Sequence, residues 1–156
     1  SIERIVAMRP AMVVLASTDH MQFLHDETGD DDQVWTDAWR TSIGQLRAAG
    51  AATVLISDTP RLQQTAPTCL AAHLTDVRPC SVSRGLALPT ERRRSMIAAA
   101  AVAAGATVID PLPWFCTTTS CPVIVNDVLV YRDKHHITTA YSRLLGPLLA
   151  EKLPLR

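Results

Sequence analysis

The sequence predicts an α/β fold built on a parallel sheet, and two patterns predict it. Apolar runs of strand length, at 12–16, 52–57 and 107–109, alternate with stretches of helical periodicity. The first run is continuously apolar, which is typical of a parallel strand buried on both faces, and the second is predicted as another buried strand. Strands that alternate with helices favour a three-layer α/β/α arrangement with right-handed crossovers.

Helices are predicted from apolar spacing and from residues that end helices. Ser1 to Met8 has the pattern of the last turns of a helix, which Pro10 ends. A second helix runs from Trp35 to Gly50, which is a good helix terminator. Its apolar face is formed by Trp35, Trp39, Ile43 and Leu46. We expect the tryptophans to anchor the core rather than to form a platform for sugars.

Two charged clusters favour solvated surfaces over binding sites. Thr90 is expected to cap a helix that begins with three consecutive arginines, at 92–94. Three adjacent side chains fan out over most of a helix circumference, so we expect a solvated face rather than a phosphate or acidic-glycan site. The acidic stretch 21–33 lacks the Gly and the terminal Glu of an EF-hand loop, which favours a solvated loop over a calcium site.

Polar residues follow the first two predicted strands. Ligands of open α/β sheets lie outside the carboxyl ends of the strands. The four residues after the first strand, 17–20, therefore face the likely site. Ser17 among them, and Asp58 after the second strand, are candidate site-lining residues. Ser17 could also act as a nucleophile with His20 as its base, but a serine that closes a strand is more often a simple cap.

The four cysteines favour two local disulfides, each closing its own loop. They are Cys69, Cys80, Cys116 and Cys121. The first bridge would tie down the segment 60–84, which otherwise has the composition of a long loop. Zinc is an alternative, although neither pair has zinc-ribbon spacing and the histidines do not form a Cys2His2 set. Free thiols in a cytosolic protein are the other alternative.

Charge and hydropathy argue against several classes of protein. Lys plus Arg (15) equals Asp plus Glu (15), so no net field favours nucleic acid or an anionic membrane. The longest apolar run, near 97–104, is far shorter than the ~20 residues of a bilayer-spanning helix. The first eight residues do not have the pattern of a secretory leader, so we expect export to depend on a segment outside this chain.

The stretch 121–149 carries the strongest chemical signal. Two β-branched runs flank Asn126-Asp127, which predicts a tight hairpin. Asp133 and His136 follow, and then Thr138 or Thr139 can cap a helix. The predicted apolar stripe of this helix is Ile137, Tyr141, Leu144 and Leu148. One loop therefore presents a carboxylate and an imidazole together, as serine acyl transfer requires.

Asp133 and His136 resemble the Asp-x-x-His block of SGNH (GDSL-type) hydrolases. The paired cysteines, the hairpin, Tyr-Arg-Asp and His-Ile-Thr are similar to the SGNH domain fused behind acyltransferase-3 membrane proteins. The resemblance implies a flavodoxin-like (SGNH) fold with strand order 2-1-3-4-5 and a short β-hairpin. Residues 1–156 would be the C-terminal two-thirds of one such domain, with strands 3, 4 and 5 present. Strand 3, at 12–16, would then have an unpaired edge.

The resemblance also implies an activity: O-acyl transfer or ester hydrolysis by a Ser-His-Asp mechanism, with His136 as base and Asp133 as its orienter. The expected partners are an acyl donor, of acetyl or another short acyl group, and a cell-envelope glycan or glycolipid acceptor. No metal or organic cofactor and no nucleic acid are expected. The resemblance favours disulfides and an extracytoplasmic location, tethered through an acyltransferase-3 membrane domain.

The family's Gly-Asp-Ser block, its oxyanion-hole Gly and its oxyanion-hole Asn have no counterpart here. We therefore expect a missing N-terminal segment of the same domain to supply the nucleophile. Two alternatives remain open. One is a non-catalytic glycan-binding or scaffold domain that kept the fold without the nucleophile. The other is a cytosolic α/β domain of unrelated function, which free thiols would indicate.

Overall fold

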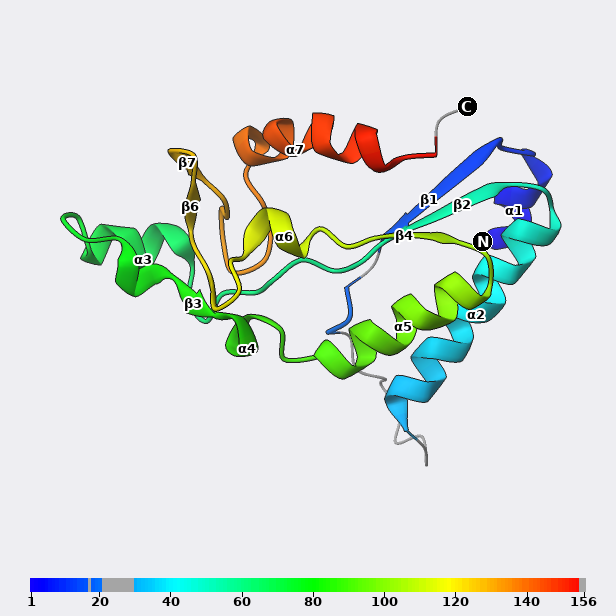
Figure 1. Ribbon diagram of the computed structural model, residues 1–156, viewed down its shortest axis with the longest axis horizontal. Helices are drawn as coiled ribbons and strands as arrows, with labels where there is room; N and C mark the ends of the chain where they lie inside the picture. Colours follow the sequence, from blue (N-terminus) through cyan, green and yellow to red (C-terminus); the bar gives the residue numbers. More distant parts are fainter. Residues whose placement is uncertain (17, 21–29, 155–156) are drawn as a thin grey trace. The chain divides into compact units, whose positions relative to one another are not determined.

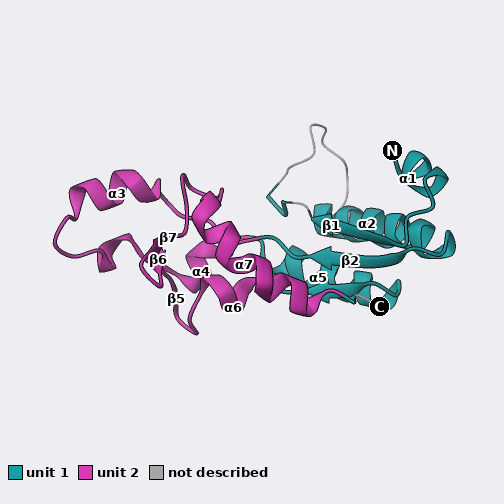
Figure 2. Cartoon of the chain, turned by 90° about the horizontal axis from the view of Figure 1, so that it is seen from above, with its two compact units in different colours: residues 1–58, 90–110, 154–156 teal, residues 59–89, 111–153 magenta. Residues whose placement is uncertain are grey.

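The computed structural model describes residues 1–16, 18–20 and 30–154. The chain forms two compact units, coloured separately in Figure 2. The first comprises residues 1–58, 90–110 and 154–156, and the second comprises residues 59–89 and 111–153. Within the described residues, the helices are all too short or too polar to span a bilayer.

The first unit is built on a parallel three-stranded sheet, drawn in Figure 1. Its strands are β1 (Met12–Ala16), β2 (Ala52–Ile56) and β4 (Thr107–Ile109), in the order β1-β2-β4. In register, Val14 lies opposite Val54, and Ile56 lies opposite Ile109. All three predicted strands and their parallel direction are confirmed.

The central strand β2 is more deeply buried than the edge strand β1. In β2, Val54 and Leu55 are 0% and 3% exposed, so burial on both faces is confirmed there. In β1 the same prediction is wrong, because Val14 is 46% exposed. Among the described residues, β1 pairs only with β2. It therefore has the unpaired edge that was expected for strand 3.

Helices α2 (Asp31–Ala48) and α5 (Glu91–Ala103) lie side by side and pack on the sheet, and α1 (Ile2–Ala7) precedes β1 (Figure 1). Ile43 of α2 and Ile97 of α5 meet Leu55 in a buried core. Trp35 and Trp39 pack against this core, as predicted. After α2, Gly50 has a φ of +89°, a conformation that favours glycine, which confirms it as the terminator.

Two predictions of solvated charge need partial correction. Residues 21–29 of the acidic stretch lie outside the described residues, but its end is helical rather than a loop, since Asp30 caps α2 and its carboxylate accepts the N–H of Asp32. Arg93 and Arg94 are only 8% and 9% exposed. Arg93 pairs with Asp32 at 2.7 Å, while Arg92 pairs with Asp30 and Asp32. Arg93 and Arg94 can be buried because carboxylates of the same unit neutralise them, which a single-helix argument cannot foresee, whereas Arg92 is 61% exposed as predicted.

The second unit is made of short elements around its own core. Its first half contains α3 (Ala66–Ala72), the 3-10 helix η1 (Arg78–Cys80), β3 (Val82–Ser83) and α4 (Arg84–Ala87). Its second half contains α6 (Leu112–Phe115), β5 (Ser120–Cys121), β6 (Ile124–Val125), β7 (Val128–Leu129) and α7 (Thr139–Lys152). Phe115, Tyr131 and Tyr141 are among the side chains buried in its core.

The segment 60–84 is therefore not one long loop. Pro67 lies in the first turn of α3, where a missing N–H costs no hydrogen bond. The disulfide Cys69–Cys80 joins α3 to η1, and Cys116–Cys121 closes the loop between α6 and β5. No described cysteine is free, so both predicted disulfides are confirmed and the zinc and free-thiol alternatives are wrong.

The hairpin and the last helix form as predicted. β6 and β7 pair antiparallel, and Asn126 and Asp127 turn between them with φ values of 49° and 60°. Thr138 caps α7 by accepting the N–H of Tyr141. The predicted apolar stripe is only partly buried, because Tyr141 is 2% exposed whereas Leu144 is 45% exposed.

Candidate active site

The predicted catalytic pair lies on a closed loop of the second unit. The loop spans Arg132 to His136, and an antiparallel bridge between Tyr131 and Ile137 forms its neck. The Arg132 N–H donates to the His136 carbonyl at 2.9 Å. Just outside the neck, the Thr138 N–H donates to the Val130 carbonyl at 2.8 Å. Backbone hydrogen bonds therefore bring Asp133 and His136 together, rather than side-chain packing alone.

The carboxylate of Asp133 accepts hydrogen bonds from other residues of this loop. Its Oδ1 accepts the backbone N–H groups of His135 and His136 at 2.9 and 2.8 Å. Its Oδ2 lies 2.7 Å from Nδ1 of the His136 ring. One residue thus fixes both the backbone and the imidazole of His136. The structure brings together the two residues that the sequence predicted as a pair.

Hydrogen bonding favours an ionised Asp133 and a His136 ring that carries its proton on Nδ1. The backbone N–H groups of His135 and His136 hold the pKa of Asp133 well below its usual range. An ionised carboxylate only accepts hydrogen bonds, so Nδ1 of His136 must donate. The lone pair of a neutral His136 ring is then on Nε2, and it is free to take a proton. The His136 side chain is 54% exposed, so a reacting group can reach it.

Asp133, His135 and His136 also form a potential metal-ligand cluster, since one ligand atom of each lies within 4.8 Å of the others. The shortest of these contacts argues for a proton rather than a metal. Two ligands of one tetrahedral zinc ion lie about 3.3 Å apart, given zinc–ligand bonds of about 2.0 Å. The 2.7 Å between Nδ1 and Oδ2 is instead the length of a direct hydrogen bond.

Contacts on both sides of the loop 132–136 hold its two ends in place. The Cys116–Cys121 disulfide is followed by Val123, whose carbonyl accepts the Val130 N–H at 2.9 Å. On the other side of the loop, the Tyr141 hydroxyl of α7 donates to the Trp114 carbonyl of α6. The stapled segment and the first turn of α7 therefore fix both ends of the loop, which keeps the pair pre-positioned.

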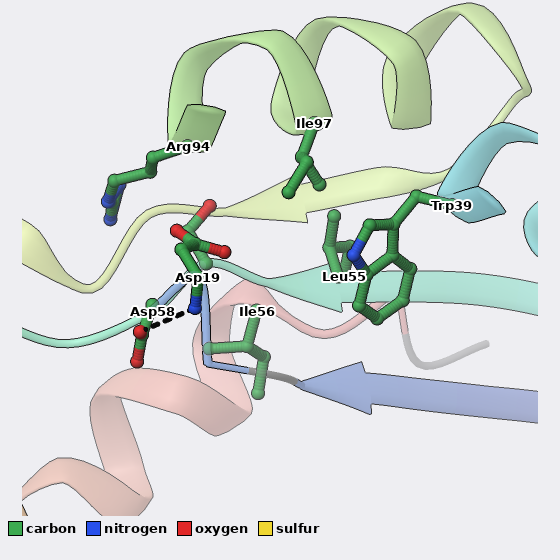
Figure 3. A pocket seen from close by; sticks show the side chains of 8 residues that line it. Asp19, Trp39, Leu55, Ile56, Asp58, Arg94 and Ile97 are labelled. Carbon is green, nitrogen blue, oxygen red and sulfur yellow. Dashed lines mark hydrogen bonds between the residues drawn. The ribbon is translucent and has the colours of Figure 1, made fainter. Parts of the chain in front are cut away.

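The first unit contributes a separate polar cluster, shown in Figure 3. The Asp19 N–H donates to Oδ2 of Asp58 at 2.9 Å, and His20 Nε2 lies 3.9 Å from the same oxygen. Asp19 and Asp58 line a small cavity of about 10 Å³ together with Arg94. Arg94 pairs with Asp110, after β4, at 2.5 Å. Charged groups thus meet at the carboxyl ends of β1, β2 and β4.

Burial, together with the nearby charge of Asp58, raises the pKa of Asp19 to about 6. Asp58 was predicted as a site-lining residue, and it does line this small cavity. Ser17 lies outside the described residues. The sequence placed Asp19 among the residues after the first strand that face the likely site. It considered Arg94 only as part of the run 92–94, and nothing in the local sequence pairs Arg94 with Asp110.

A parallel α/β sheet combined with an Asp–His pair on a strand-to-helix loop defines a domain of the SGNH hydrolase class. Residues 1–151 match the family model described as the SGNH domain fused to AT3 domains. The chain belongs to this family.

A solved structure shares the fold: the periplasmic domain of a lipopolysaccharide acetyltransferase from Salmonella ser. Paratyphi A, with a TM-score of 0.74 and 18% sequence identity. The alignment covers 97% of this chain and 59% of that chain. No curated protein matches the sequence.

Proposed function

We propose that this chain supplies the base and its orienting carboxylate to a Ser-His-Asp reaction that moves a short acyl group, such as acetyl, between oxygen atoms. The 2.7 Å contact between His136 Nδ1 and Asp133 Oδ2 carries this proposal. It leaves Nε2 as the proton acceptor and places a permanent negative charge behind the ring. That charge stabilises the imidazolium that forms when the proton arrives.

The proposed reaction has two halves. Nε2 of His136 takes the hydroxyl proton of a serine while the serine oxygen attacks the ester carbonyl. The leaving alcohol departs with that proton, and an acyl-serine remains. An acceptor hydroxyl then gives its proton to Nε2 and attacks the acyl-serine. The serine oxygen leaves and takes that proton back from Nε2, which regenerates the serine and the neutral imidazole. Water in place of the acceptor gives hydrolysis by the same steps.

The proposal places the serine upstream of Ser1. The unpaired outer edge of β1 supports this, because a preceding strand could complete the sheet there. The similar Salmonella domain is longer than this chain, which spans 59% of it. On this proposal, residues 1–156 are the C-terminal two-thirds of one SGNH domain.

The proposed acceptor is a hydroxyl of a cell-envelope glycan or glycolipid, and the proposed location is extracytoplasmic, beside a membrane acyltransferase-3 domain. The family description supports this, since such domains are fused to AT3 domains. The two disulfides fit an oxidising compartment. The similar solved structure is a periplasmic domain that belongs to a lipopolysaccharide acetyltransferase.

Fluorophosphonate labelling with mass mapping tests the proposal on this chain and on a longer chain extended upstream of Ser1. We expect a label only on the longer chain, on an upstream serine, and its loss in His136→Ala. A label on Ser17 would overturn the assignment of the nucleophile. A fully folded longer chain without any label would favour a glycan-binding or scaffold domain instead.

A further inference from the structure

The second unit contains a cavity that the Asp133–His136 pair does not use. The cavity has a volume of about 270 Å³ and lies between α3, η1, β3 and α4. This is slightly below the size of typical small-molecule sites, which is roughly 300 to 1,000 Å³. It can therefore hold one ring-sized group rather than a chain of several rings.

The lining of the cavity is uncharged and combines polar side chains with aliphatic ones. Amide and hydroxyl side chains come from Gln63, Gln64, Ser81 and Ser83, and aliphatic surface comes from residues such as Leu62 and Leu86. The lining holds no Lys, Arg, Asp or Glu. A phosphate or a carboxylate would find no cation here, and a purely apolar acyl chain would leave the amides and hydroxyls without partners. A neutral ring that carries hydroxyl groups matches both kinds of surface.

The polar groups of the cavity are largely available to a ligand. The Gln63 side-chain amide donates to the Leu86 carbonyl at 3.1 Å, which ties two of the lining segments together. Among the described residues, the side chains of Gln64, Ser81 and Ser83 make no hydrogen bond to protein. These three side chains can donate to and accept from the hydroxyls of a sugar.

One lining segment of the cavity is hydrogen-bonded to the loop that carries the Asp–His pair. Leu62, a lining residue that is 5% exposed, donates its N–H to the Lys134 carbonyl at 2.7 Å. Lys134 directly follows Asp133. The lining segment and the candidate catalytic loop are therefore held in contact by a backbone hydrogen bond. A group in the cavity would lie in the same unit as Nε2 of His136.

The lining is also pre-formed. The Cys69–Cys80 disulfide joins two of its segments, and both cysteines line the cavity. β3, which contributes Val82 and Ser83, is held by antiparallel pairing with β5. A rigid lining reduces the entropy lost when a weakly bound ligand is ordered. The backbone segments that line the cavity are thus held in place before any ligand arrives.

We propose that this cavity is a subsite for one neutral sugar ring of the acyl acceptor. The identity of the ligand as the acceptor rests on the proposed function, whereas its chemistry rests on the lining alone. The subsite selects uncharged pyranosides over uronic acids and sugar phosphates. Its role is to bind and position the acceptor, and the Asp–His pair performs the chemistry.

Saturation-transfer NMR tests the subsite directly, on this chain and on the longer chain. The probes are the methyl glycosides of glucose, galactose and mannose, with glucuronate and butyrate as the charged and apolar alternatives. We expect millimolar binding of at least one methyl glycoside and none of glucuronate or butyrate. Ser83→Trp should fill the cavity and weaken binding about tenfold or more. Gln64→Ala, at an exposed position, should weaken it severalfold without a change in fold.

The matched control is Ser142→Trp, which places the same side chain on an exposed position of α7, away from the lining. It should bind the glycoside as the wild type does. Equal binding by wild type and Ser83→Trp would overturn the subsite, as would tighter binding of glucuronate or butyrate. Fluorophosphonate labelling separates the two proposals. A labelled longer chain that binds no glycoside refutes the subsite alone, and an unlabelled longer chain that binds one refutes only the catalytic function.

Discussion

Both carboxylate oxygens of Asp133 contact His136. Oδ1 accepts the His136 backbone N–H at 2.8 Å, and Oδ2 lies 2.7 Å from Nδ1 of the His136 ring. The spacing Asp-x-x-His makes this double contact available within one short loop. The bridge between Tyr131 and Ile137 then closes the loop. The geometry of the pair is therefore local, which explains why it could be predicted without the rest of the fold.

Removing either partner should abolish activity of the longer chain. We expect His136→Ala to remove the base, and Asp133→Asn to lower kcat by about 10⁴-fold, the loss seen when a catalytic histidine is held in the wrong tautomer. Ester hydrolysis and fluorophosphonate labelling measure both effects. The matched control is His135→Ala, because the His135 ring is 3.9 Å from Asp133 and its backbone N–H survives the change. Activity of His136→Ala near that of the wild type would remove it from the mechanism.

Local signals predicted the strands, the hairpin, the disulfides and the Asp–His pair. β1 was predicted with its observed bounds because Met12 to Ala16 is an uninterrupted apolar run before polar residues. The hairpin turn followed from Asn126-Asp127, two residue types that tolerate a positive φ. Each of these features depends on neighbours in the sequence, so pattern rules apply to them.

The contacts that the sequence did not predict join partners distant in sequence. Arg93 lies 61 positions from Asp32, and that ion pair allows the arginine to be buried. Asp19 and Asp58 meet only because their strands are adjacent in a parallel sheet. No local pattern encodes either contact. The same holds for the sugar-sized cavity, which several short elements enclose.

The two disulfides should differ in their contribution to stability. The chain-entropy model gives about 3 kcal/mol for a loop the size of Cys69–Cys80, which are 11 residues apart, and about 2 kcal/mol for Cys116–Cys121, which are 5 apart. We expect Cys69→Ala/Cys80→Ala to lower the free energy of unfolding more than Cys116→Ala/Cys121→Ala. Urea denaturation under non-reducing conditions measures both. The reverse order would show that strain or packing, rather than loop closure, decides these contributions.

Two buried tyrosines should respond in opposite directions to loss of the hydroxyl. The Tyr141 hydroxyl donates to the Trp114 carbonyl, so Tyr141→Phe should lower the free energy of unfolding by about 1 kcal/mol. The Tyr131 hydroxyl is buried without a hydrogen-bond partner among the described residues. Tyr131→Phe should therefore leave stability unchanged or raise it by about 1 kcal/mol.

This tyrosine pair provides its own control, because both rings contact Phe115, with centroids 6.0 and 5.4 Å away, and both substitutions keep the ring. Chemical denaturation of the two variants in parallel gives the comparison. Marked destabilisation by Tyr131→Phe would mean that its hydroxyl has a partner outside the described residues, such as a buried water.

Stability of the first unit should depend on pH through Asp19, whose side chain lies in the polar cluster of Figure 3. Burial raises its pKa from 3.8 to about 6. Between these values the folded state binds more proton than the unfolded state, so stability falls as pH rises through this window and levels off above about 6. Asp19→Asn removes the ionised form and with it this loss.

We therefore expect Asp19→Asn to stabilise the protein more at pH 8 than at pH 4.5, with a difference of roughly 2 kcal/mol in the free energy of unfolding. Denaturant titrations at the two pH values measure it. Asp37→Asn is the control, since Asp37 is an exposed carboxylate of the same unit, paired with Arg40 on α2. It should change stability by less than about 0.5 kcal/mol at either pH. If Asp19→Asn instead destabilises the protein most at pH 8, the attraction of Arg93 and Arg94 for the ionised carboxylate outweighs the cost of burying it.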